Sequence, residues 1–75
     1  MHRKARIYIK DDTLIIATPY HEEFVYDLKQ IVPISDRSFD PDTKNWIVTD
    51  LALGDDVAEL IQDYFDDYLD GREPA

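Results

Sequence analysis

In each half of this 75-residue chain, apolar residues first recur at every second position and then at every third or fourth. Side chains alternate between polar and apolar over residues 6–10, and β-branched residues follow at 14–18. Asp11 and Asp12 separate these segments and supply turn chemistry, so we predict a β-hairpin. Thr18 and Pro19 then suit the N-cap and first position of a helix. The apolar residues of this helix recur at spacings of four, four and three and end before Pro33. They are Tyr20, Phe24, Leu28 and Ile31.

A second hairpin and a second helix are predicted in the remaining half. Residues 37–39 and 45–49 read as strands around a turn at 40–44, where Asp and Pro suit a type I turn. Phe39 and Trp46 flank this turn, and we expect them to cover one end of the core. The last helix starts after Gly54 with Asp55 or Asp56 as its cap, and Gly71 ends it. Its apolar positions are Val57, Leu60, Ile61, Tyr64, Phe65, Tyr68 and Leu69.

The resulting order ββαββα predicts an α+β fold, a small four-stranded and mainly antiparallel sheet with two helices packed on one face. A chain of this length forms a single domain, residues 1–75, and we expect an ordered core over about 6–70 with flexible ends. The 44% apolar content exceeds that of disordered acidic chains. No cysteine, secretory signal or apolar segment of membrane-spanning length is present, so we expect a soluble, cytoplasmic protein.

Two stretches of the chain resemble the HARP-type domain of annealing helicases and related fork-remodelling proteins. The first runs from Thr18 to Lys29 and includes the Tyr/Phe/Leu helix, and the second is the hairpin from Arg37 to Val48 with the pattern Phe-x-Pro-x-x-Lys-x-Trp. The resemblance implies a non-catalytic module that recognises branched or forked DNA, while a separate motor hydrolyses ATP. No Gly-x-x-x-x-Gly-Lys-Ser/Thr loop is present here.

The basic residues of the chain are concentrated near its start. Residues 1–10 carry four bases, Arg3 and Lys4 among them, and no acid, whereas residues 51–75 carry eight acids and one base. Strand alternation places Arg6, Tyr8 and Lys10 on one face. An aromatic ring beside a base can stack on a nucleobase while the base neutralises phosphate. The candidate nucleic-acid residues are therefore Arg6, Tyr8 and Lys10, and the resemblance to the HARP-type hairpin adds Arg37, Lys44 and Trp46.

The net charge of −9 is unusual for a nucleic-acid binder. We therefore expect branched or single-stranded DNA to be bound together with a helicase or nuclease partner. The alternative hypothesis is an acidic protein-interaction or regulatory domain, or a DNA mimic, that binds a basic partner through its last helix. The candidate acids for this are Glu59, Asp63, Asp66, Asp67 and Asp70.

Catalytic and metal-binding groups do not form a recognisable constellation. His2 and His21 are the two histidines, and neither has a partner at metal-ligand spacing. The acidic segment 36–42 lacks the glycine and terminal Glu of an EF-hand loop. We therefore expect no enzyme activity, no cofactor and no metal.

Overall fold

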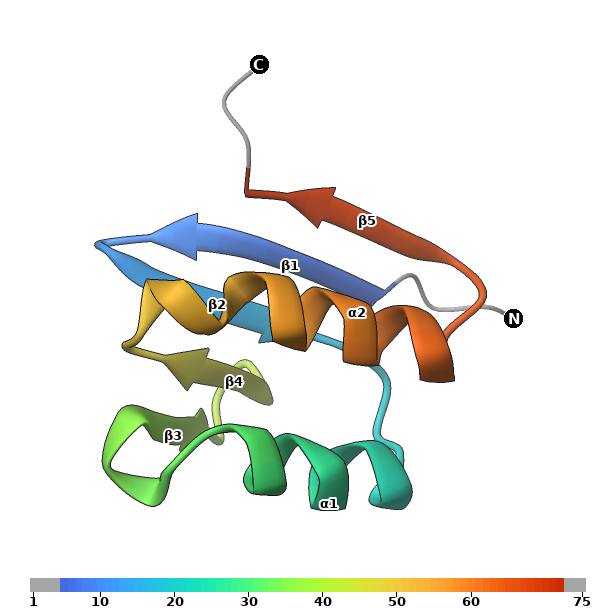
Figure 1. The fold of residues 1–75 in the computed structure, drawn as a ribbon, viewed down its shortest axis with the longest axis horizontal. Coiled ribbons are helices and arrows are strands. Elements are labelled where there is room, and N and C mark those ends of the chain that lie inside the picture. The colour runs from blue at the N-terminus through green and yellow to red at the C-terminus, as the bar shows by residue number, and fades with distance from the viewer. Residues whose placement is uncertain (1–4, 73–75) are drawn as a thin grey trace.

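The computed structural model describes residues 5–72, which form a five-stranded mixed sheet with both helices on one face (Figure 1). The strands lie in the order β3-β4-β2-β1-β5. Their bounds are β1 (Ala5–Lys10), β2 (Thr13–Ala17), β3 (Arg37–Asp40), β4 (Asn45–Val48) and β5 (Tyr68–Gly71), with helices α1 (Glu22–Ile31) and α2 (Gly54–Tyr64). Short 3-10 helices cover Ile34–Asp36 and Leu51–Leu53. The α+β class is confirmed.

Both predicted hairpins are present and set the register of the sheet. In the first hairpin, Tyr8 lies opposite Ile15, and Asp11 and Asp12 have φ angles of 52° and 63°. Two left-handed residues are what a two-residue type I′ turn requires. In the second hairpin Phe39 lies opposite Trp46. The pairing of β2 with β4 joins the hairpins and leaves β3 at one edge of the sheet.

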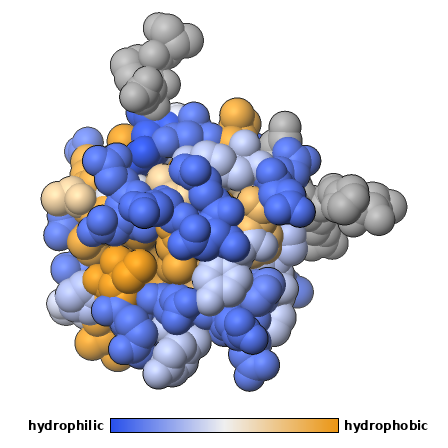
Figure 2. All heavy atoms as spheres, turned by 45° about the vertical axis from the view of Figure 1, so that its right-hand side comes forward, coloured by the Kyte–Doolittle hydropathy of each residue, from blue (hydrophilic) through white to orange (hydrophobic). Residues whose placement is uncertain are grey.

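The core lies between the helices and one face of the sheet. Alternate strand residues point toward the helices, and four aliphatic side chains among them are fully buried: Ile7, Leu14, Ile16 and Val48. The helices contribute Phe24, Leu28, Val57 and Ile61 to the same cluster. Outside the core, hydrophilic residues cover most of the surface shown in Figure 2, with hydrophobic atoms in patches between them.

Helix α1 begins three residues later than the Thr18–Pro19 cap predicts. His21 is the N-cap, and its Nδ1 accepts a hydrogen bond of 3.3 Å from the Phe24 amide. The imidazole also packs edge-on against the Tyr64 ring at 4.8 Å, which fixes the start of the helix against α2. Tyr20 therefore precedes the helix and is 82% exposed, instead of belonging to its apolar face.

The helices are also joined by a polar contact. The Tyr64 hydroxyl at the end of α2 donates a hydrogen bond to Asp27 Oδ2 on α1. This bond to a carboxylate favours the protonated phenol and raises the pKa of Tyr64 to about 12. The contact holds the two helices together outside the apolar core.

The predicted last helix is wrong at both ends. No side chain caps α2 at residue 55 or 56; instead the Asp50 carboxylate caps the preceding 3-10 helix by accepting from the Ala52 amide. The helix stops at Tyr64, and residues 68–71 form β5, which pairs in parallel with β1. This fifth strand replaces the predicted helical turns because it satisfies the backbone groups along the free edge of β1.

Candidate nucleic-acid interface

The sheet face that the helices leave uncovered carries Arg6, Tyr8 and Lys10 of β1. The strand register places Arg6 beside Ala17 and Leu69, and Tyr8 beside Ile15. Ile47 of β4 lies on the other side of Ile15. Tyr8 and Ile47 flank Ile15, which is only 9% exposed although no helix covers it. The face therefore has an apolar centre with basic side chains on β1.

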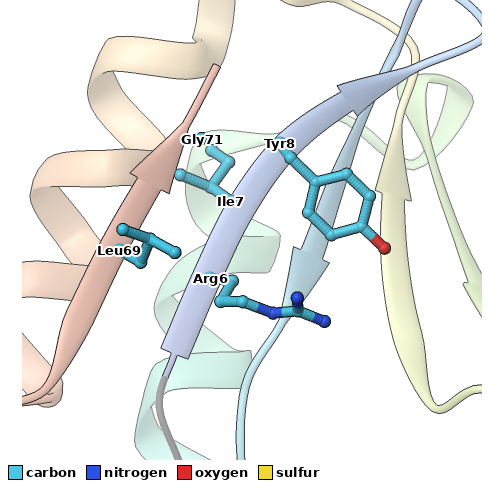
Figure 3. A pocket seen from close by; sticks show the side chains of 5 residues that line it. All are labelled: Arg6, Ile7, Tyr8, Leu69 and Gly71. Carbon is cyan, nitrogen blue, oxygen red and sulfur yellow. The ribbon is translucent and has the colours of Figure 1, made fainter. Parts of the chain in front are cut away.

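Arg6 and Tyr8 stack on each other on this face. The Arg6 guanidinium carbon lies 5.5 Å from the centroid of the Tyr8 ring, a cation–π distance. Figure 3 shows both side chains on the same side of β1, with Leu69 on the neighbouring strand. The contact orients a positive charge and an aromatic ring side by side.

A first hollow lies beside this pair and is lined by Arg6, Ile7, Tyr8, Leu69 and Gly71 (Figure 3). Gly71 lies opposite Tyr8 in the parallel ladder. A β-carbon at this glycine would lie 3.4 Å from both the Tyr8 β-carbon and the Ile7 carbonyl oxygen. The missing side chain therefore keeps the space next to the Tyr8 ring open.

A second hollow at the end of the sheet joins Arg6 to Lys44. It is lined by residues from the start of β1, the end of β2 and the turn before β4: Arg6, Ala17, Thr18, Pro19, Thr43, Lys44 and Asn45. Lys44 has a φ of 61°, a left-handed conformation that costs a non-glycine residue about 1–2 kcal/mol. The turn alone would thus favour glycine or asparagine, and strain of this kind is typical of functional positions.

A third hollow, which we call the aromatic cleft, lies on the helix side of the same sheet end. It is lined by Thr18, Pro19, Tyr20, Val25, Phe39, Lys44 and Trp46. The Phe39 and Trp46 rings are 5.1 Å apart and tilted by 58°. Lys29 Nζ lies 5.8 Å from the centroid of the Trp46 ring. Lys44 belongs to both the second hollow and the aromatic cleft.

The expectation that Phe39 and Trp46 cover the core holds only for the tryptophan. Trp46 is half-buried and packs against the core cluster. Phe39, on the edge strand, is 47% exposed. The difference follows from strand order, because β4 is covered by β2 and β3 on its two sides while β3 has one neighbour.

Negative charge is sparse on the uncovered sheet face. Within the described strands, Asp40 is the one acid that alternation places there. Its Oδ1 accepts a hydrogen bond of 3.0 Å from the Asp42 amide, and this bond lowers the pKa of Asp40. The carboxylate is thus engaged in the turn. The carboxylate keeps its negative charge, but Arg6 and Lys10 outnumber it on this face within the described strands, although the whole chain carries a net charge of −9.

Some basic candidates lie elsewhere. Arg37 points to the helix side, where its Nη1 donates to the Val32 carbonyl at 2.6 Å, so it joins β3 to the end of α1 and is absent from the three hollows. Arg3 and Lys4 lie outside the described residues.

The acidic candidates do not form one helix face. Glu59 and Asp63 lie on α2, Asp66 and Asp67 follow it in a turn, and Asp70 lies on β5. The Asp70 carboxylate accepts from Arg72 Nη2 at 2.6 Å, and Asp55 Oδ1 accepts from Arg72 Nη1 at 2.9 Å. The Arg72 hydrogen bonds hold the pKa of Asp70 down at about 2. The expectation that all five candidate acids lie on the last helix is therefore wrong.

Local pattern does not identify Thr18 and Tyr20 as residues that line the aromatic cleft, and it does not place Lys29 beside the Trp46 ring. The spacing of apolar residues predicts instead that Tyr20 belongs to the apolar face of α1. The pattern His21-Glu22-Glu23 could have indicated the true start of the helix, because acidic residues favour the first turn. That start would have placed Tyr20 in the connection, close to the second hairpin.

Within residues 5–72, no group of three His, Cys, Asp or Glu side chains is placed to hold a metal ion. None of the described helices has the length and hydrophobicity needed to cross a membrane. Comparisons of the chain with protein-family models, curated proteins and solved structures found no match. A function must therefore be inferred from the residues of the chain itself.

Proposed function

We propose that this protein is a non-catalytic module that binds branched or single-stranded DNA as an accessory in repair, recombination or replication-fork processing. The observation that carries this proposal is the Arg6–Tyr8 stack on the uncovered sheet face, next to an open hollow. The resemblance of residues 18–29 and 37–48 to HARP-type domains supports the setting of fork processing.

The geometry suits unpaired nucleotides better than an intact duplex. A nucleobase can stack on the Tyr8 ring only when it is free of its own strand, and such stacking contributes about 1–3 kcal/mol per base. Arg6, Lys10 and Lys44 are then available to phosphates. The hollows flanking Arg6 provide space along the chain of a single strand.

The acidity of the chain limits its affinity when it acts alone. Counterion release from phosphate supplies much of the binding free energy, and three free cations provide little of it. Charge screening over about 8 Å at physiological salt separates the basic face from distant acids. A helicase or nuclease partner would supply further phosphate contacts, so the module serves as a recognition unit.

Titration of labelled fork, single-stranded and duplex DNA by fluorescence anisotropy at low salt tests the proposal. We expect the first two to bind more tightly, and the logarithm of affinity to fall with log salt at a slope of about −2 for three phosphate contacts. Arg6→Gln should reduce that slope by about 0.7, and Tyr8→Leu should weaken binding at least about fivefold.

Tyr26→Leu is the matched control, because Tyr26 is 64% exposed on α1 and lines none of the three hollows. Its affinity should equal that of the unmodified protein. Failure of all three DNA forms to bind would refute the proposal, as would equal losses in the Tyr8 and Tyr26 variants.

The alternative of a basic partner on the acidic last helix has less geometric support. Of its five candidate acids, α2 retains Glu59 and Asp63, and Asp70 is already paired with Arg72.

A further inference from the structure

We propose that the aromatic cleft holds one nucleobase of the same DNA strand that stacks on Tyr8. This inference rests on the proposed function and adds to it a second base-binding position, on the opposite side of the sheet. The cleft lies between the segment that precedes α1 and the second hairpin.

The walls of the cleft are largely apolar and aromatic. Phe39 and Trp46 form a tilted pair 5.1 Å apart, and Val25 and Pro19 add apolar surface. Tyr20 completes the lining with a side chain that is 82% exposed and has no ring partner among the described residues. An exposed aromatic side chain at the edge of an aromatic pair is available to cover an inserted base.

Charge selects an anionic aromatic ligand over a neutral one. No acidic residue lines the cleft, whereas Lys44 does. Lys29 Nζ lies 5.8 Å from the Trp46 ring centroid and places a second cation at the same aromatic surface. A nucleotide combines a flat ring with a phosphate, so it satisfies both the aromatic walls and the cations.

The cleft is continuous with the Tyr8 face. Lys44 lines the cleft and the second hollow, and Arg6 lines the second hollow and the first. A single strand can therefore pass from Tyr8 along Arg6 and Lys44, around the end of the sheet, to Trp46. Duplex DNA could not follow this path, because its bases are stacked and paired.

Trp46 is the single tryptophan of the chain, so its fluorescence reports directly on the cleft. Oligothymidylate of eight nucleotides is titrated while Trp46 emission and the anisotropy of a labelled copy are recorded in parallel. We expect the emission to be quenched with the same midpoint as the anisotropy change. Tyr20→Ala should weaken binding at least about fivefold, from loss of one stacking contact. Tyr26→Ala, on the exposed side of α1, should leave it unchanged.

The outcomes separate this inference from the proposed function. In one outcome, anisotropy shows binding that is lost in Tyr8→Leu, while Trp46 emission does not change and Tyr20→Ala binds with full affinity. This outcome would overturn the base-binding role of the cleft and leave the proposed role of the sheet face intact. Absence of binding at low salt would overturn both. Circular dichroism of each variant verifies that the substitutions leave the fold intact.

Discussion

Lys44 shows how a single residue links the backbone of a turn to the surface of a site. Its amide donates to the Asp40 carbonyl at 2.7 Å and closes the loop between β3 and β4. Its φ of 61° places the chain in a region that glycine enters without steric cost. A lysine at this position is accordingly unfavourable for the turn, and its side chain lines two hollows.

Replacing Lys44 should therefore move stability and binding in opposite directions. Lys44→Gly is expected to increase the free energy of unfolding by about 1 kcal/mol, because the left-handed strain is relieved. The same change should weaken binding of single-stranded DNA. Urea denaturation and anisotropy titration measure the two effects.

Lys44→Ala separates strain from charge. This variant keeps a β-carbon in the left-handed conformation but loses the ammonium group, so it should weaken binding with no gain in stability. A Lys44→Gly variant with unaltered affinity would remove this residue from the site.

The aromatic residues show that the burial of a side chain cannot always be predicted from its position in the sequence pattern. The spacing of Phe24 and Leu28 correctly predicted fully buried side chains. The same reasoning placed Tyr20 on the apolar face of α1 and predicted that both Phe39 and Trp46 cover the core. The burial of these three depends on which strand lies at an edge and where a helix starts, and both are set by contacts between distant segments.

At the scale of elements, both hairpins and the presence of two helices could be predicted from local pattern, whereas the first residue of each helix could not. The end of α2 could not be predicted either. Tyr68 and Leu69 continue the helical spacing of Leu60, Ile61 and Tyr64 equally well. The free edge of β1, more than 50 residues away in sequence, makes them a strand. Such long-range pairing leaves no mark on local spacing, and it also places Asp70 on a strand instead of on α2 with Glu59 and Asp63.

The ion pair at the end of β5 predicts a response to acid. Because Arg72 lowers the folded-state pKa of Asp70 from 3.8 to about 2, ionised Asp70 stabilises the fold above about pH 4. That contribution is lost as the pH falls from about 4 toward 2. Thermal melting of the unmodified protein and of Arg72→Gln between about pH 2 and about pH 6, a range that brackets both pKa values, should show a smaller acid-induced drop in melting temperature for the variant.

Gln30→Ala provides the control for this prediction, since Gln30 is an uncharged residue exposed on α1. Its pH profile should match that of the unmodified protein over the acid range. Parallel profiles for Arg72→Gln and the unmodified protein would show that the ion pair makes no contribution to the fold.

On the scale of the whole molecule, the net charge does not describe the charge of the uncovered sheet face. The net charge of −9 predicted a poor nucleic-acid binder. Among the acids of the described strands, however, Asp40 alone lies on the uncovered sheet face, and the other described acids lie on the two helices, in turns and loops, and on the helix side of β5. Strand alternation alone predicted that Arg6, Tyr8 and Lys10 share a face. The hollows that connect this face to Lys44 and Trp46 required the tertiary structure, because they join four segments distant in sequence.

The parallel ladder between the first and last strands has a mechanical consequence. Ala5 lies opposite Tyr68 and Tyr8 opposite Gly71, with both strands running the same way. Tension applied between handles placed before β1 and after β5 would slide these strands along each other and load their hydrogen bonds simultaneously. Tension applied across the second hairpin, between residues 37 and 48, would open its bonds one after another. Force spectroscopy should therefore record a higher rupture force for the first attachment, and equal forces would show that the ladder does not bear the load.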